Sequence, residues 1–215
     1  MVDEKMLNFV KDFIESHDAI GTKLQRRFPF RSLYDHCFRC CKWAQRINEF
    51  EGGDPEVTQI SALFHDVGKC VDNTVQGHAE AGALACGEYL DSIGFDANKR
   101  DRITRIVRLH IEHCSGEESS VEGMIESDAD LLDETGAMTV LWDCMAVGAE
   151  DQQSYQIAYY RVRGTFETLQ TKTRSSFHTA TGWRFFEERR EFLGDFVANL
   201  EFELGIVKEL KKDPH

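Results

Sequence analysis

The sequence predicts an all-α protein. Proline is absent between Glu56 and Asp213, and this suits long helices because proline removes a hydrogen bond from a helix interior and clashes with the preceding turn. Apolar side chains recur at intervals of three and four residues along much of the chain, which is the period of a helix with one buried face. The length of 215 residues suits one domain with a sizeable core.

The individual helices are predicted from their apolar faces, taken in chain order. The faces consist of Met6, Val10, Phe13 and Ile14; Cys40, Ala44 and Ile47; Ile60, Leu63, Phe64 and Val67; Ile103, Ile106, Val107 and His110; and Phe186, Leu193, Phe196, Val197, Leu200 and Leu204. Each set falls on one side of a helix. Each therefore predicts a helix with a core-facing side.

Local signals mark the ends of some of these helices. Asp54 precedes Pro55, a strong helix start because proline lacks an N–H that the first helical position does not need. Gly68 follows an apolar face and is predicted to cap the C-terminal end of that helix. The polar segment 114–120 is predicted to be a loop. None of these breaks is large enough to separate domains.

The composition excludes several classes of function. The chain has 38 acidic and 25 Lys or Arg residues, a formal net charge of −13, and such a chain repels phosphate backbones, so we expect no strong nucleic-acid binding. No apolar run approaches the roughly 20 residues of a membrane helix, so we expect no membrane partner. Seven cysteines without a signal-like start indicate a reducing compartment, and we expect the cytoplasm.

Three of the cysteines lie together in the sequence. Cys37 and Cys40 form a CxxC pair, and Cys41 is beside them. A four-cysteine zinc site would need a second such pair, which the chain lacks. We therefore interpret these cysteines as small core residues on a helix.

Residues suited to chemistry concentrate in the first two-thirds of the chain. His36 shares a helical face with Cys40, so its imidazole is predicted to point inward. His65 and Asp66 end an apolar helix, and Lys69 follows three residues later. Adjacent residues within a helix face different directions, but at a fraying helix end both can reach one ion.

These segments resemble the HD superfamily of metal-dependent phosphohydrolases. The resemblance is carried by DHCFRCCKWA (35–44), LFHDVGK (63–69), GHAEAGA (77–83), RLHIEH (108–113) and DADLLDETGA (128–137), of which LFHDVGK is the most specific. Residues 179–204 are also similar to the closing helices of a bacterial subgroup of stand-alone HD hydrolases.

The resemblance implies an HD-domain helical bundle with additional C-terminal helices. A single domain would cover residues 1–215, with its metal-binding part at about 20–149 and a helical extension at about 150–215.

The resemblance also implies a divalent metal site. The implied ligands are His36, His65, Asp66 and Asp130. Asp130 is preferred to Asp128 because the last ligand of the family is the second acid of a D-A-D pattern, and Leu131 stands where the family often has arginine. Two imidazoles and two carboxylates suit Mn, Mg, Fe, Co, Ni or Zn. Such an ion can lower the pKa of its water from about 15.7 to about 7.

Roles for the surrounding residues follow from the same resemblance. The implied catalytic residues are Asp66, which would also accept a proton, Lys69, which would stabilise phosphoryl charge, and His110, which would protonate the leaving group. The implied substrate-binding residues are Lys69, His78, His110, His113 and Arg39. Ligation of a second ion by the additional histidines stays open, and Arg39 could instead brace a ligand carboxylate.

The predicted function is hydrolysis of a phosphoester or phosphoanhydride bond in a nucleotide or a similar small metabolite. Two alternatives stay open: an HD-type di-iron oxygenase and a non-catalytic module that senses a nucleotide. The oxygenase would use His36, His65, Asp66, His78, His110 and Asp130 as ligands. The sequence leaves the oligomeric state open, a homo-oligomer included.

Overall fold

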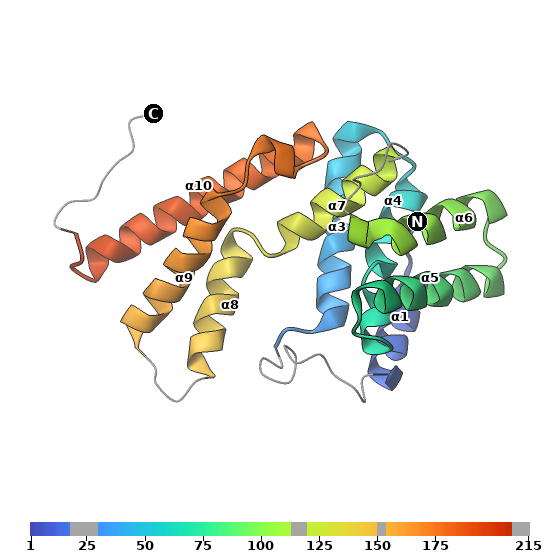
Figure 1. Ribbon diagram of the computed structural model, residues 1–215, viewed down its shortest axis with the longest axis horizontal. Coiled ribbons are helices and arrows are strands. Elements are labelled where there is room, and N and C mark those ends of the chain that lie inside the picture. The colour runs from blue at the N-terminus through green and yellow to red at the C-terminus, as the bar shows by residue number, and fades with distance from the viewer. Residues whose placement is uncertain (18–29, 113–119, 150–153, 208–215) are drawn as a thin grey trace. The chain divides into compact units, whose positions relative to one another are not determined.

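The computed structural model describes residues 1–17, 30–112, 120–149 and 154–207, and within these ranges the chain is helical without strands (Figure 1). The all-α prediction is confirmed. The helices are α1 (Glu4–His17), α3 (Leu33–Glu51), α4 (Pro55–Phe64), α5 (Val75–Ser92), α6 (Ala97–Leu109), α7 (Val121–Asp133), α8 (Ala137–Gly148), α9 (Tyr155–Gln170) and α10 (Ala180–Glu203). Short 3₁₀ turns are η1 (Val67–Cys70), η2 (His110–Glu112) and η3 (Arg174–Ser176).

Two predictions from the sequence, the loop at 114–120 and the lack of a membrane helix, can be compared with the structure only in part. The predicted loop at 114–120 lies outside the described residues except for Ser120. Among the helices of the described ranges, none has both the length and the apolar character needed to span a membrane.

The chain divides into two compact units. Unit 1 comprises Met1–Asp133 and His178–Gly182, and unit 2 comprises Glu134–Phe177 and Trp183–His215. The single-domain organisation with an extension from about residue 150 stays a prediction.

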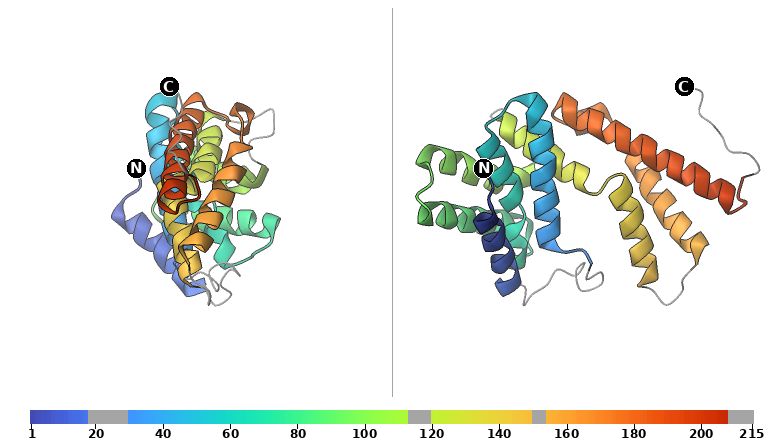
Figure 2. Two further views of the ribbon diagram at one scale, coloured as in Figure 1. Left: turned by 90° about the vertical axis from the view of Figure 1, so that its left-hand side faces the viewer. Right: turned by 180° about the vertical axis from the view of Figure 1, so that it is seen from behind.

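Unit 1 contains the larger apolar core. Helix α3 packs against α4 and α7, and α5 packs against α6 (Figure 2). The core side chains include Met6, Val10, Ile14, Cys37, Cys41, Val57, Ile60, Leu63, Phe64, Leu90, Ile103 and Val107. The apolar faces predicted for the first four helices therefore point inward, and each large side chain so buried stabilises the fold by about 1.5–3 kcal/mol.

Helix α4 is buried along most of its length. Every residue from Val57 to Phe64 is buried, and α3, α6 and α7 pack around the helix. As predicted, Pro55 opens the helix and Asp54 caps it, accepting hydrogen bonds from the backbone N–H groups of Glu56 at 3.0 Å and Val57 at 3.3 Å. A cap of this kind contributes about 1 kcal/mol. The C-terminal end of α4 therefore lies in the interior of unit 1.

Gly68 is not the helix cap that the sequence predicts. Helix α4 ends at Phe64, and Gly68 lies within η1. A Cβ atom at Gly68 would collide with the backbone of His78 and Gly82 in α5. Glycine is required because η1 and α5 meet backbone to backbone, and this contact brings His78 to the end of α4.

Unit 2 contains α8, α9 and most of α10. Its core is formed by Tyr159, Val162, Leu193 and Val197. Of the apolar face predicted for the C-terminal helix, Phe186, Leu193 and Val197 are buried, and Phe196, Leu200 and Leu204 are partly buried. The Tyr159 hydroxyl donates to Glu201 at 2.6 Å and accepts from Arg163 at 2.7 Å. These bonds satisfy the one polar atom of a fully buried tyrosine and tie α9 to α10.

Because η1 and α5 meet closely at Gly68, a methyl group added at this position should destabilise the fold. Gly68→Ala should lower the free energy of unfolding by about 1–3 kcal/mol, the usual cost of overpacking, because backbone atoms cannot turn aside. Gly164→Ala is a matched control: this position in α9 has no neighbouring atom within 4 Å, and alanine should stabilise the helix by about 0.5–1 kcal/mol. Urea unfolding of both variants measures this, and equal stabilities would contradict the argument.

Candidate metal centre

The end of α4 places two adjacent side chains on the same site. Helix α4 stops at Phe64, and His65 and Asp66 form the corner that leads into η1. Within a helix, adjacent residues would point about 100° apart, but at this corner Nε2 of His65 lies 3.6 Å from Oδ2 of Asp66. Both residues are nearly inaccessible to solvent, at 0% and 3% exposure.

His36 from α3 and Asp130 from α7 join this pair to form a first group. Nε2 of His36 lies 3.2 Å from Nε2 of His65 and 3.3 Å from Oδ2 of Asp66. Oδ1 of Asp130 lies 3.4 Å from Nε2 of His36 and 3.6 Å from Nε2 of His65. The structure thus brings together the four residues that the sequence assigns as metal ligands.

A second group forms on the other oxygen of Asp66. Nε2 of His78 in α5 and Nε2 of His110 in η2 lie 3.1 Å apart. Oδ1 of Asp66 is 3.6 Å from the first and 3.4 Å from the second. Asp66 therefore presents one carboxylate oxygen to each group, in the manner of a bridging ligand.

All four imidazoles are oriented through their other ring nitrogen. Nδ1 of His36 hydrogen-bonds to Asp133 (2.8 Å), and Nδ1 of His65 to the Ala62 carbonyl (2.9 Å). Nδ1 of His78 hydrogen-bonds to the Thr74 carbonyl (2.8 Å), and Nδ1 of His110 to the Val107 carbonyl (2.7 Å). Carbonyl and carboxylate oxygens only accept, so each Nδ1 carries the proton and each Nε2 is left to bind a cation. Convergent imidazole nitrogens and carboxylate oxygens fit a divalent ion.

Comparison with known proteins identifies the family. Residues 33–135, which contain both groups, match the family model of the HD domain. The chain carries an HD domain over residues 33–135. Like the HD superfamily hydrolases, it has an all-α fold with His and Asp clusters able to hold metal.

Several relatives share this HD fold over nearly the whole chain. The uncharacterised protein YpgQ of Bacillus subtilis is 26% identical over 181 residues, which is 82% of this chain and 86% of YpgQ. The crystal structure of a predicted HD superfamily hydrolase from an uncultured Thermotogales bacterium is 26% identical, with a TM-score of 0.64 and coverage of 94% of this chain and 92% of that one. A crystal structure of YpgQ in complex with ADP has a TM-score of 0.56 at 21% identity and covers 92% and 97% of the two chains.

Arg39 and Asp133 hold the first imidazole of the HD site in place. The Arg39 guanidinium donates to Asp133 from Nε at 2.6 Å and from Nη2 at 2.9 Å, and Asp133 in turn accepts from His36. Burial alone would raise the pKa of Asp133, but hydrogen bonds from His36 and Arg39 hold this pKa below its usual range. The structure therefore places Arg39 on a carboxylate that supports His36, whereas the sequence had suggested that it could brace a ligand carboxylate itself.

Protons and a metal ion compete for the same positions in this HD domain. Burial alone would lower the pKa of His65, but the charges of Asp66 and Asp130 raise it to about 9. Burial would likewise raise the pKa of Asp130, but His65 holds this pKa at about 2. A divalent ion would replace the protons as the partner of these carboxylates.

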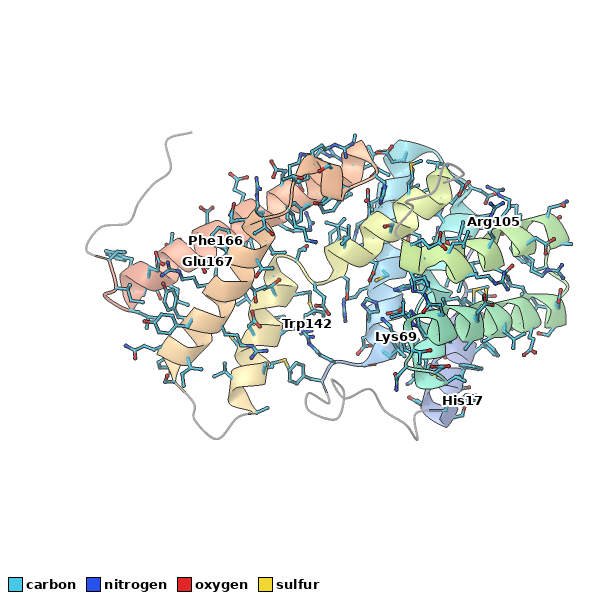
Figure 3. The ribbon with its side chains drawn as sticks, viewed as in Figure 1. His17, Lys69, Arg105, Trp142, Phe166 and Glu167 are labelled. Atoms are coloured by element: carbon cyan, nitrogen blue, oxygen red, sulfur yellow. The ribbon has the colours of Figure 1, made fainter. Side chains whose placement is uncertain are left out.

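Lys69 also contacts the shared carboxylate. Its ammonium forms an ion pair with Oδ2 of Asp66, and Figure 3 shows Lys69 in the turn that leads into α5. Burial alone would lower the pKa of Lys69, but Asp66 raises this pKa, so the ammonium stays charged at neutral pH.

Two buried residues near the HD site were missed by the sequence analysis as functional candidates. Cys40 groups with His36, His65 and Asp130. Glu126 is 2% exposed, and burial raises its pKa to about 7 despite the opposing charges of nearby histidines. The signal that could have found both is the spacing of four residues, from His36 to Cys40 and from Glu126 to Asp130.

Other polar residues lie outside both groups. His17 is exposed at the end of α1 and bonds to the Phe13 carbonyl, and Glu80 pairs on the surface with Arg108. His178 belongs to neither group. His113, assigned to substrate binding from the sequence, lies outside the described residues.

Asp128 has a different environment from Asp130. It is fully buried and accepts hydrogen bonds from the backbone N–H of His178 at 2.9 Å and from both the N–H and the hydroxyl of Thr179, at 2.8 and 2.6 Å. Gly182 packs directly against its carboxylate. Asp128 thus fixes the segment 178–182 to α7.

These placements predict different defects for the two acids of the D-A-D pattern. Asp128→Ala should lower the free energy of unfolding by about 1–3 kcal/mol for each buried donor left without a partner, with Mn²⁺ affinity retained while the protein is folded. Asp130→Ala should weaken Mn²⁺ binding by at least about tenfold, since even outer partners of ligands cost about 10–100-fold. Urea unfolding and Mn²⁺ titration followed by electron paramagnetic resonance measure both effects. The assignment is wrong if Asp128→Ala loses the ion and Asp130→Ala keeps it.

Proposed function

We propose that the protein is a metal-dependent phosphohydrolase that cleaves a phosphoester or phosphoanhydride bond in a nucleotide or similar small metabolite. The observation that carries this proposal is the carboxylate of Asp66, whose two oxygens face two separate pairs of imidazoles. A divalent ion at such a site supplies Lewis acidity toward a phosphoryl oxygen and makes hydroxide available near neutral pH.

The geometry supports ligands for two ions. The first would be held by His36, His65, Asp66 and Asp130, and the second by Asp66, His78 and His110. For His110 the sequence favoured protonation of the leaving group. Its Nδ1 donates to the Val107 carbonyl while Nε2 faces Asp66, and this arrangement supports a ligand role instead.

Lys69 and Asp66 act together in the proposed reaction. Burial alone would raise the pKa of Asp66, but the surrounding imidazoles, His65 foremost, hold it well below its usual range. Asp66 is therefore a weak proton acceptor and serves to orient the Lys69 ammonium. That ammonium, on a side chain 37% exposed to solvent, binds a nonbridging phosphoryl oxygen and stabilises the charge that develops there.

A nucleotide substrate is supported by YpgQ, which has been crystallised in complex with ADP. The net charge of −13 does not prevent the binding of an anionic nucleotide. Bound cations are the largest local charges in a metal site, and they would make the local charge there positive. The Lys69 ammonium adds to this local positive charge.

The proposal is tested by phosphate or pyrophosphate release from a nucleotide panel with Mn²⁺, Mg²⁺, Co²⁺ or Ni²⁺. The wild type should release product, a chelator should stop release, and Asp66→Ala should reduce it by at least about 100-fold because both groups lose their common ligand. Asp101→Ala, which changes a largely exposed acid, should retain activity. Equal product release by wild type and Asp66→Ala contradicts the mechanism. If the wild type binds a nucleotide but releases no product with any of the four ions, the protein is a sensing module.

A di-iron oxygenase is the second candidate, because the six donors in two groups include every ligand that it would need. The same residues that would hold two ions for hydrolysis are those that a di-iron site needs. Metal analysis after expression in iron-replete medium separates the candidates. About two tightly bound irons per chain with substrate-dependent oxygen consumption would establish the oxygenase, whereas exchangeable Mn²⁺, Mg²⁺ or Co²⁺ with product release is expected for the hydrolase.

A further inference from the structure

Cys40 lies within the first group, although the proposed function gives it no role. It follows His36 by four residues on α3 and is 1% exposed. Its Sγ lies 3.8 Å from both ring nitrogens of His36 and 4.0 Å from Oδ1 of Asp130. Together with an atom of His65, these donor atoms all lie within 4.8 Å of one another. Cys40 therefore lies beside the four proposed ligands of the first ion as a further donor side chain.

Sγ of Cys40 is near enough to the donors of the first group to reach the same ion after a side-chain rotation. With Zn–S near 2.3 Å and Zn–N near 2.0–2.1 Å, a bound sulfur lies about 3.5 Å from the neighbouring donors. Sγ of Cys40 lies 3.8 Å from His36, 4.0 Å from Asp130 and within 4.8 Å of the His65 donor atom. Its equal distance to Nδ1 and Nε2 of His36 means that coordination requires the Cys40 side chain to turn about its Cα–Cβ bond. The spacing of four residues keeps both side chains on one helical face during that rotation.

We propose that Cys40 is a sulfur donor to the ion held by His36, His65, Asp66 and Asp130, and this proposal rests on the metal-dependent function proposed above. Sulfur favours thiophilic ions such as Zn²⁺ and Cd²⁺, whereas Mg²⁺ and Mn²⁺ favour oxygen. When a thiophilic ion binds, a metal–sulfur bond forms, the S–H bond breaks, and the proton leaves to solvent. An oxygen-seeking ion leaves the thiol protonated. Cys40 thereby shifts the preference of the site toward thiophilic ions.

The neighbouring Cys41 provides a matched control. It is also 1% exposed on α3, but it packs in the apolar core of unit 1 and has no place in the donor groups of the described residues. Cys41→Ser and Cys40→Ser make the same chemical change one residue apart. A difference between them reports the position of the sulfur rather than the loss of a buried thiol.

Absorption spectroscopy of the Co²⁺-loaded protein tests the proposal without an activity assay. Wild type and Cys41→Ser should show a sulfur-to-Co²⁺ charge-transfer band in the near ultraviolet, and Cys40→Ser should lose it. In competition titrations with a chelator, Cys40→Ser should bind Cd²⁺ at least about tenfold more weakly while its affinity for Mn²⁺ is unchanged.

The outcomes separate this inference from the function on which it rests. If the wild type binds neither Co²⁺ nor Mn²⁺, the proposed metal-dependent function fails. If it binds them but shows no sulfur band, or if Cys40→Ser weakens Cd²⁺ and Mn²⁺ equally, only the sulfur donor is overturned. Should Cys40→Ser fail to fold, X-ray absorption of the Zn²⁺-loaded wild type and Cys41→Ser decides. A sulfur neighbour at about 2.3 Å is then expected, and a shell of nitrogen and oxygen alone overturns the proposal.

Discussion

The buried carboxylate of Asp66 is the constraint on which unit 1 depends. It is 3% exposed, and a buried charge costs several kcal/mol unless partners surround it. Those partners come from α3, the end of α4, α5, η1 and η2, in the form of four imidazoles and the Lys69 ammonium. Each of these elements must pack so that a side chain reaches the same two oxygens. The packing of these helices and the geometry of the site therefore depend on each other.

The backbone is shaped to meet that requirement at two points. Helix α4 ends at Phe64, so that the next two residues face one site rather than different sides of a helix. Gly68 then allows η1 to touch α5, where a side chain would meet the backbone of His78 and Gly82. Without that approach the imidazole of His78 would be held away from Asp66. The second group thus depends on Gly68, because even a methyl side chain at this position would keep η1 and α5 apart.

Helix α7 shows how one motif serves two purposes. Asp128 and Asp130 are two residues apart, so their side chains point about 200° apart on the helix. Asp130 turns to the metal centre, and Asp128 fixes the segment 178–182. Asp133, one turn further, supports His36 and is itself held by Arg39. These carboxylates have partners, so the formal charge of −13 overstates the negative charge at the centre.

The apolar faces in the sequence by themselves predicted α1, α3, α4, α6 and α10, and the resemblance of the sequence motifs to the HD superfamily implied the four side chains of the first group. Helical faces are local patterns, and a resemblance to a family is carried by short motifs, so both can be recognised without knowing how helices pack. Tertiary structure alone decided that His78 and His110 share the second oxygen of Asp66, that Arg39 braces Asp133, and that Cys40 lies among the donors. It also decided that Gly68 serves a close contact rather than a cap. These features depend on distances between residues far apart in the chain, and such distances are set by packing rather than by local periodicity.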